Sequence, residues 1–458
     1  MFSRKFYPQI IAFTFSFLLL GMGSVLAQRV WTLEECVLYA LENNIQIKQS
    51  RLQTETAEIN LLQSKLDFAP SLNANSSIGN SWGRSIGASN TYETNTATNN
   101  SFNLSSSIEL FGGMKKWNTL QKNEIDYKAS KYISEEMENN IALALTGGYL
   151  QILFNHEMLR IAEKQIEVTK QQISRTEKLV EAGSLPSGDL LEIQAQGATE
   201  ESNLIMARNA VDLSYLDLKQ MMDIPSHEEL EIDFPEMEVS KELQIIPSEQ
   251  VYANAVDIMP EIKSSEMNVQ SAEKAIQIAK GYLYPTLSLS GGIGTNYYSS
   301  QKETLFDINN FPYQGNTIPY LDQIEGNTGE YLTLSLSIPI FNGYAARSNV
   351  NRSKVQSISR NFDLELRKNE LRKNIEQKYH DAIAAYKTHN ANKITVESLT
   401  ESFKYTEEKF AVGMLTSLDY SLAKMRLTQA ESDLLRAKYD YIFKTKILDF
   451  YMGIPLSL

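Results

Sequence analysis

The side chains able to do acid–base, metal or nucleophilic chemistry form no catalytic motif in this sequence. The histidines lack the spacing of metal ligands; they are His156, His227, His380 and His389. There is no nucleophile elbow, and no glycine-rich phosphate loop follows a strand. The segment SGGIG at 290–294 is glycine-rich, but no helix pattern opens after it. We therefore expect no enzyme activity, no metal site and no cofactor.

Two aspartates occupy equivalent positions in a stretch that the sequence repeats. The stretches VEAGSLPSGDLLE (180–192) and AVGMLTSLDYSLA (411–423) place Gly, Leu, Ser and Asp at two-residue steps. The residues are Gly183, Leu185, Ser187 and Asp189, and again Gly413, Leu415, Ser417 and Asp419. An acid in the first turn of a helix interacts favourably with the positive helix end, which is the simplest role for Asp189 and Asp419.

The repeated turn belongs to a duplication of the whole chain. Residues 35–70 align with 250–285 at an offset of 215, and residues 104–225 align with 334–455 at an offset of 230. The offset changes only between 80–103 and 295–333, which predicts a loop of unequal length. Periodic self-similarity of this kind indicates one structural unit used twice.

The N-terminal segment 1–27 has the pattern of a secretory signal peptide. Arg4 and Lys5 precede an apolar run at 10–20, and Val-Leu-Ala at 25–27 forms a cleavage site. A membrane anchor is the alternative, but the apolar run is shorter than about 18–20 residues. We therefore expect an exported protein.

The net charge limits the classes of ligand that the protein can bind, and the cysteine content limits its disulfide bonds. The formal net charge is −13, which argues against nucleic acid or anionic lipid as a ligand. Cys36 is the only cysteine, so there is no internal disulfide framework, and we expect it to pack as a small hydrophobe.

Each repeat predicts the same order of elements. A helix at 33–68, and again at 248–283, is stopped by Pro70 or Pro285. Two strands follow, then a long helix without proline, the repeated turn and a return helix. The predicted strands are 71–82 and 102–110, then 286–297 and 331–340; the long helices are 114–181 and 344–410, and the return helices 190–222 and 421–452. We assign 28–225 and 248–458 to the two repeats, and 226–247 to an acidic linker with little regular structure.

The strands alternate apolar residues with Ser, Asn, Thr and Gly. Each is about ten residues long, enough to cross a bilayer as a tilted strand. Four strands cannot close a membrane barrel, because the smallest use about eight. Either the sheet is soluble and half-buried, or several chains pool their strands in one barrel.

The repeated turn reads as the tip of a long antiparallel helical hairpin, between residues 182–189 and again 412–419. Gly183 and Gly413 suit the left-handed position after a helix, while Ser187 and Ser417 are candidate N-caps of the return helices. Gly147-Gly148 predicts a bend in the first long helix. Heptad spacing on the return helices predicts coiled-coil packing, through Tyr420, Leu427, Leu434, Tyr441 and Leu448, and through Leu190, Gly197, Leu204, Val211 and Leu218.

This duplicated arrangement resembles the TolC family of outer-membrane efflux channels. The tips AGSLPSGD and VGMLTSLD and the strand-to-helix corners ELFGG and PIFNG carry the resemblance, which covers the mature chain. It implies a mainly helical homotrimer in the outer membrane of a Gram-negative cell, with a 12-stranded barrel from four strands in each of three chains. A coiled-coil tunnel would cross the periplasm, and its tips would dock on a periplasmic adaptor bound to an inner-membrane transporter.

The resemblance also assigns roles at the tips. Asp419 matches a family gate aspartate, the next family aspartate falls on Leu422, and Glu192 stands at the equivalent place in repeat one. Asp189 matches an acid that a family tyrosine holds. That tyrosine and a family arginine correspond to Phe410 and Leu415, so these links to close the tip are missing. The implied gate is Asp419, Asp189 and Glu192, and the adaptor contacts are Gly183, Leu185, Ser187, Gly413, Leu415 and Ser417.

Two other functions remain open at this point. The same architecture would serve as the outer-membrane conduit of a type I protein secretion system. An exported coiled-coil adhesin would explain the helices but not the duplicated strand pairs.

Overall fold

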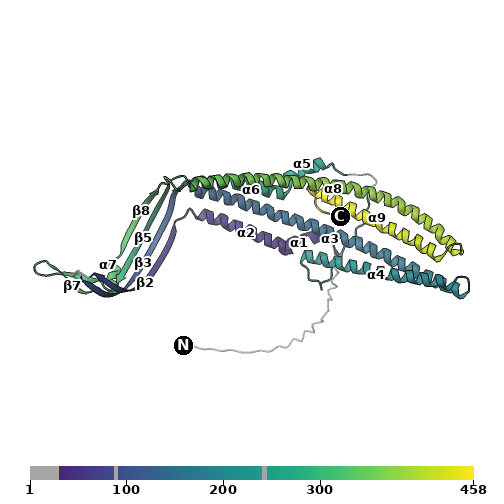
Figure 1. The fold of residues 1–458 in the computed structure, drawn as a ribbon, viewed down its shortest axis with the longest axis horizontal. Helices are drawn as coiled ribbons and strands as arrows, with labels where there is room; N and C mark the ends of the chain where they lie inside the picture. The colour runs from purple at the N-terminus through teal and green to yellow at the C-terminus, as the bar shows by residue number, and fades with distance from the viewer. Residues whose placement is uncertain (1–29, 87–90, 240–244, 458) are drawn as a thin grey trace, which may run out of the picture.

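The computed structural model describes residues 30–86, 91–239 and 245–457, which form an elongated molecule (Figure 1). A β-sheet forms one end, and two long helical hairpins reach the other. The expected signal segment 1–27 lies outside the described residues.

The two repeats have the same order of principal elements. Repeat one contains α1 Leu33–Asn43, α2 Ile45–Leu66, β2 Ser71–Ile86, β3 Tyr92–Gly112, α3 Lys115–Glu181 and α4 Ser187–Met222. Repeat two contains α5 Ser248–Ile258, α6 Pro260–Gly281, β5 Thr286–Tyr298, β8 Gly329–Ser337, α8 Ala345–Ala411 and α9 Ser417–Tyr451. We call α3 with α4 hairpin one, and α8 with α9 hairpin two.

The first helix of each repeat is broken, whereas the sequence predicted one continuous helix. Asn44 leaves the helical conformation with ψ 129°, and its side-chain oxygen caps α2 by accepting from the amides of Gln46 and Ile47. At the corresponding place in repeat two, Met259 is extended because Pro260 follows it. A polar cap and a proline thus produce the same break.

The sheet is antiparallel, in the order β2-β3-β5-β8. Apolar residues of neighbouring strands share one face, as in the ladder Ala74–Leu104–Ile293. Small polar residues share the other, where the hydroxyls of Ser77 and Ser101 lie 2.8 Å apart. β3 begins ten residues earlier than predicted, at Tyr92 against 102, and β8 ends at Ser337 rather than at 340.

The segment predicted as an unequal loop is partly structured. In repeat one β2 and β3 simply extend into it. In repeat two it holds a small hairpin, β6 Lys302–Phe306 with β7 Pro312–Thr317, and the short helix α7 Tyr320–Gly326. The buried Gln323 fixes this insertion on β5, because its amide bonds both the N–H and the C=O of Tyr298.

The long helix α3 runs without a break through Gly147-Gly148, where we predicted a bend. A side chain at 148 would lie 2.6 Å from the Met221 methyl group of α4, and one at 147 would lie 3.2 Å from the Phe443 ring of α9. The two glycines therefore allow α4 and α9 to approach α3 closely.

The linker after repeat one also contains more structure than predicted. Its segment β4 Glu231–Ile232 pairs in parallel with β1 Val30–Trp31. The hydroxyl of Tyr149 on α3 donates to the carbonyl oxygens of Asp233, at 2.8 Å, and Trp31, at 3.2 Å. The linker therefore holds the start of repeat one against the middle of α3.

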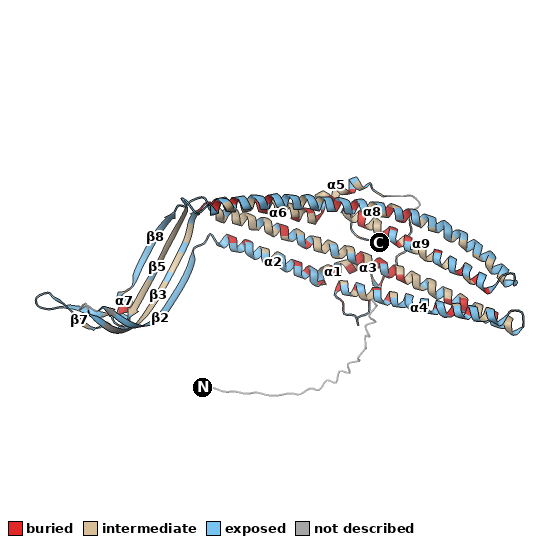
Figure 2. Cartoon of the chain, in the orientation of Figure 1, coloured by how far each residue is buried: buried red, intermediate tan, exposed pale blue. Residues whose placement is uncertain are grey.

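Buried residues follow stripes along the helices, while the sheet is largely exposed or half-exposed (Figure 2). One apolar cluster includes Cys36, Leu145 and Leu218, and a second includes Val251, Ile375 and Leu448 at the repeat-equivalent positions. Cys36 is fully buried there, as predicted for a small hydrophobe. No helix among residues 30–86, 91–239 and 245–457 is long and apolar enough to span a membrane.

Candidate gate at the hairpin tips

Both hairpins reverse at a glycine in the left-handed conformation, as predicted. Gly183 has φ +72° and Gly413 has φ +75°. The amide of Ser184 bonds the carbonyl of Leu179 at 2.8 Å, and the amide of Met414 bonds that of Lys409 at 2.9 Å. These are Schellman caps, which satisfy the last carbonyl groups of α3 and α8. No atom outside the neighbouring residues lies within 4 Å of a side chain placed at either glycine, so the backbone angle alone requires glycine.

The N-caps of the return helices stand one residue earlier than predicted. Pro186 precedes α4 and Thr416 precedes α9, so Ser187 and Ser417 are the first helical residues. Thr416 and Asp419 form a reciprocal capping box. The Thr416 hydroxyl accepts from the Asp419 amide at 3.2 Å, and the Asp419 carboxylate accepts from the Thr416 amide at 3.3 Å and from the Thr416 hydroxyl at 2.7 Å. Asp419 is thus a helix-start residue whose carboxylate is exposed to solvent.

A hydrogen bond joins the two tips. Ser417, only 1% exposed, donates its hydroxyl to the carboxylate of Asp189 at 2.9 Å. The side chain of Ser417 is therefore covered within the chain, unlike its repeat partner Ser187, which is exposed. Glu192, one turn further along α4, is exposed, and Leu185 and Leu415 are half-buried.

Phe410 takes part in an aromatic cluster inside hairpin two. Its ring stacks on Tyr420 at 4.9 Å between centroids, and Phe403 lies 5.4 Å from the same tyrosine. Burial, reinforced by Glu407 and Glu200, raises the pKa of Tyr420 to about 12. Phe410 therefore holds α9 against α8 through packing rather than through a hydrogen bond.

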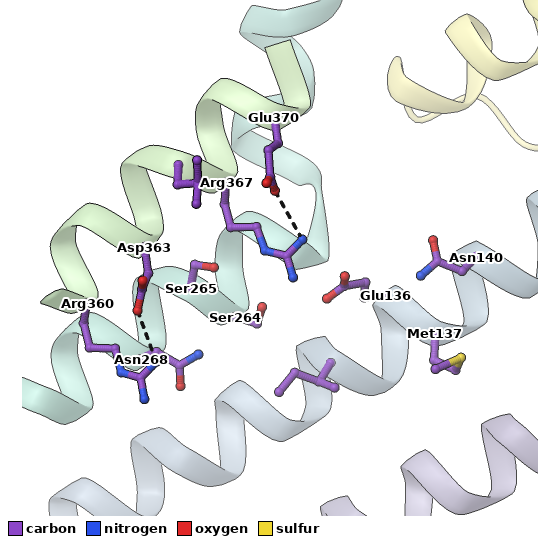
Figure 3. A pocket seen from close by; sticks show the side chains of 12 residues that line it. Glu136, Met137, Asn140, Ser264, Ser265, Asn268, Arg360, Asp363, Arg367 and Glu370 are labelled. Atoms are coloured by element: carbon purple, nitrogen blue, oxygen red, sulfur yellow. Dashed lines mark hydrogen bonds and ion pairs between the residues drawn. The ribbon is translucent and has the colours of Figure 1, made fainter. Parts of the chain in front are cut away.

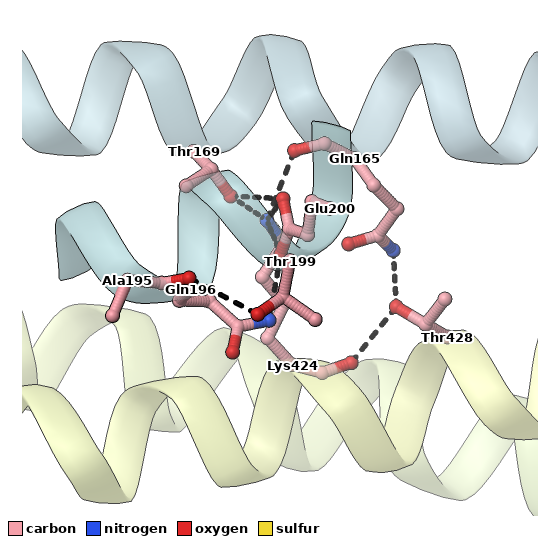
Figure 4. A network of polar contacts seen from close by, with 8 residues as sticks. All are labelled: Gln165, Thr169, Ala195, Gln196, Thr199, Glu200, Lys424 and Thr428. Carbon is pink, nitrogen blue, oxygen red and sulfur yellow. Dashed lines mark hydrogen bonds and ion pairs between the residues drawn. The ribbon is translucent and has the colours of Figure 1, made fainter. Parts of the chain in front are cut away.

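A buried ion pair lies further along the return helices from the tips, and the sequence analysis did not identify it. The ammonium group of Lys424 on α9 lies 3.1 and 3.2 Å from the two carboxylate oxygens of Glu200 on α4 (Figure 4). It also donates to the Gln165 carbonyl at 3.0 Å and to the Thr169 hydroxyl, both on α3. Lys424 is 5% exposed and Glu200 is 7% exposed.

Neighbouring groups complete the coordination of this pair. Gln196 donates to Glu200 at 3.0 Å, and Thr169 donates to the other oxygen of the same carboxylate. Burial lowers the pKa of Lys424, while its contacts with Glu200 act in the opposite direction. The sequence held one signal: Glu200 stands three residues after Gly197 and four before Leu204, inside the predicted apolar stripe.

The tips therefore carry carboxylates and hydrogen-bond donors. Among the described ranges, no three His, Cys, Asp or Glu side chains gather as metal ligands. Such an arrangement can hold the two hairpins together and place negative charge at their tips.

The comparisons with known proteins all indicate the same family. The family described as "Outer membrane efflux protein" matches residues 38–222 and 251–453. The chain is 22% identical to the outer membrane protein TolC of Salmonella enteritidis, over 80% of this chain and 73% of TolC. It is 23% identical to the alkaline protease secretion protein AprF of Pseudomonas aeruginosa, over 70% of this chain and 62% of AprF.

Solved structures of channels share the fold. A structure of CusC superposes with a TM-score of 0.75 at 17% identity, covering 94% of this chain and 96% of that one. The Campylobacter jejuni CmeC outer membrane channel superposes with a TM-score of 0.74 at 17% identity, over 92% of this chain and 85% of that one. With a family match over most of its length, this chain belongs to the outer membrane efflux proteins of the TolC family, which reside in the outer membrane of Gram-negative bacteria.

Proposed function

We propose that this protein is the outer-membrane exit duct of a tripartite efflux system. Three chains form one channel, and substrates pass through it unchanged from an inner-membrane pump and a periplasmic adaptor to the exterior. The observation that carries this proposal is that a single chain leaves matching edges open at the sheet and along the helices.

The four-stranded sheet has two open edges, β2 and β8. Its apolar face exposes large side chains, including Leu72 at 70%, Trp82 at 74% and Leu332 at 77%. Such a face suits lipid, but open edges cannot persist in a bilayer, where every backbone group needs a partner. In the proposed assembly, β8 of one chain pairs with β2 of the next, so that three chains close the sheet into a barrel with no open edge.

The helical layer also has two open edges. α3 packs between α2 and α6, and α6 packs against α8, so α2 and α8 lie at opposite edges of the layer (Figure 1). α2 exposes an apolar stripe with a period of seven, formed by Ile45, Leu52, Ile59 and Leu66. α8 exposes Val355, Ile358, Phe362 and Leu366. Two different apolar edges favour head-to-tail contacts that close a ring.

A cavity of about 690 Å³ lies beside the α8 edge, between α3, α6 and α8 (Figure 3). Leu366 lines it together with charged groups that pair along α8: Arg360 with Asp363 at 3.2 Å, and Arg367 with Glu370 at 3.6 Å. The cavity thus offers a place for side chains of a neighbouring α2.

The tips support the adaptor role. Gly183 and Gly413 are exposed, with open space around them, and Leu185 and Leu415 present partly covered apolar surface. A helical hairpin of an adaptor could approach such small, capped turns closely. The acids Asp419 and Glu192 are exposed near the same end, so the channel would narrow at a negatively charged opening.

The relatives differ in cargo, because AprF is named for protease secretion and CusC for cation efflux. The protein secretion conduit therefore remains the second candidate. The coiled-coil adhesin leaves the sheet with open edges unexplained, and the family assignment argues against it.

Native mass measurement of the detergent-purified protein tests the assembly. We expect a trimer for the wild type, and smaller species for Leu52→Glu/Ile59→Glu, which places charge on the α2 stripe. Gln53→Glu, on a neighbouring exposed face of α2, is the control and should stay trimeric. A stable wild-type monomer would contradict the proposal.

Deletion of the gene tests the transport role. The deletion strain should accumulate small toxic compounds, and the wild-type chain should restore their export together with a co-purifying pump and adaptor. If the strain instead loses only a secreted protein, the conduit function replaces efflux.

A further inference from the structure

The contact between the two hairpins changes character along the molecule. Near the middle it is apolar: Phe154 of α3 meets Tyr439 of α9 at 6.0 Å between ring centroids, and Ile442 belongs to the same buried cluster. Towards the tips it becomes polar, through Gln165, Thr169, Asp189, Glu200, Ser417, Lys424 and Thr428. We call these seven residues the tip seam.

A polar seam can separate where an apolar core cannot. Opening an apolar contact exposes hydrophobic surface to water at a cost proportional to its area. Polar groups that separate can instead exchange their hydrogen bonds for bonds to water. The tip seam is therefore the part of the contact between hairpins that can open without disrupting the core.

Two groups beside the seam favour an opened, wetted state. The Oγ1 of Thr176 and the Nε2 of Gln172 are buried on α3 and have no hydrogen-bond partner among the described residues. Thr176 lies about two helical turns from Thr169 and is fully buried. Entry of water would satisfy both groups, so their burial opposes the closed arrangement.

The Lys424–Glu200 pair opposes that opening. It connects α9 to α4 directly, and Lys424 reaches α3 through Gln165 and Thr169 (Figure 4). Both charges are buried and fully coordinated, a geometry in which removing one partner is strongly destabilising. The other links between the hairpins in this described region are single hydrogen bonds, those of Gln165 with Thr428, of Ser417 with Asp189 and of Arg175 with the Ala411 carbonyl at 3.4 Å.

Comparison of the two repeats indicates that this ion pair belongs to the contact between hairpins of one chain and not to the contact between hairpins of adjacent chains. The repeat partner of Lys424 is Gln194, and that of Glu200 is Ala430. In a ring of three chains, hairpins of the same chain and hairpins of adjacent chains alternate. The repeat-equivalent seam between chains would therefore lack this ion pair.

We propose that Lys424 and Glu200 are the residues that set the closed position of the tunnel, by fastening hairpin two to hairpin one below the tip. Loss of the pair releases the tip seam and widens the opening. This inference rests on the proposed channel function.

Conductance of the purified full-length protein in planar lipid bilayers tests the proposal. Lys424→Met and Glu200→Gln should each raise the resting open fraction roughly tenfold or more. The reversed pair Lys424→Glu/Glu200→Lys restores the attraction between α9 and α4 but places a carboxylate against the Gln165 carbonyl, so it should return conductance only part of the way to the wild-type value. Lys170→Met and Glu201→Gln are matched controls, because that pair joins α3 to α4 on the surface at 3.7 Å, with side chains 67% and 50% exposed. They should leave conductance unchanged.

Assembly must be verified for each variant by native mass. If Lys424→Met does not assemble, Lys424→Gln/Glu200→Gln decides, since it leaves no unpaired buried charge and should still raise conductance. Wild-type conductance in assembled variants that lack the pair would overturn the proposal. A wild-type protein that forms no channel would instead contradict the proposed function.

Discussion

Ser417 and Asp189 join the two tips across the duplication: the hydroxyl at the start of α9 donates to the carboxylate in the first turn of α4 at 2.9 Å. Ser417 is buried where it makes this contact, whereas its repeat partner Ser187 is exposed. The same residue type at equivalent positions therefore has two different environments. One serine belongs to a link between hairpins, and the other lies on the surface.

Ser417→Ala should loosen the tips. It removes one hydrogen bond to a partly buried carboxylate, which contributes about 1.5 kcal/mol. We expect a moderate rise in resting conductance, smaller than that of Lys424→Met, with trimer assembly unchanged. Ser187→Ala is the matched control and should have no effect. Equal conductance of the two alanine variants would show that the Ser417 bond does not restrain the tips.

The tips were predictable because their signals are local. A left-handed turn requires glycine, so the backbone angles of Gly183 and Gly413 followed from residue type and position. The cap of α9 was misplaced by one residue, although Thr416 and Asp419 have the three-residue spacing of a capping box. Two hydroxyl residues stand side by side there, and only the backbone conformation distinguishes them.

The buried pair was not predictable, because Lys424 and Glu200 are joined only by the relative register of three long helices. The place of Glu200 inside an apolar stripe was the one available signal of a buried partner, and it could not specify which residue that partner is. The early start of β3 was missed for a related reason. The segment YETNTATNNS lacks apolar alternation, and its strand is defined by backbone pairing with β2.

Gly413→Glu should abolish efflux at a normal protein level. The change places a charge in the open space around the tip and also strains the left-handed cap. Gly413→Asn separates these effects, because asparagine tolerates the left-handed conformation and is neutral. We expect the Gly413→Asn variant to retain most of the activity in a drug-accumulation assay. Normal efflux by the Gly413→Glu variant would argue against an adaptor contact here.

His156 should make the protein less stable in acid. Burial lowers its pKa below the ordinary value of 6.5, and its ring contacts Tyr215 and Phe234. Below that value the unfolded chain takes up a proton before the folded chain does, so the free energy of unfolding falls as pH decreases from about 6.5 through the folded pKa. His156→Phe keeps an aromatic ring and should reduce the loss of Tm between about pH 7.5 and pH 5.

The exposed His227 provides the control for this measurement. His227→Phe makes the same replacement on the surface and controls for the general effect of exchanging histidine for phenylalanine on Tm. An unchanged Tm difference in His156→Phe would show that protonation of this half-buried ring does not contribute.

Asp419 should control the ion selectivity of the channel. Its carboxylate is exposed in the first turn of α9, so the proposed trimer carries three such charges near the narrow end. They would attract cations there. Asp419→Asn removes the charge while its side-chain oxygen can still accept from Thr416, so the helix start is kept. We expect lower cation selectivity and weaker block by multivalent cations in single-channel recordings.

Asp189→Asn should change selectivity much less, because Asp189 is partly covered by Ser417. If Asp419→Asn conducts with wild-type selectivity, the carboxylate acts only as part of the capping box.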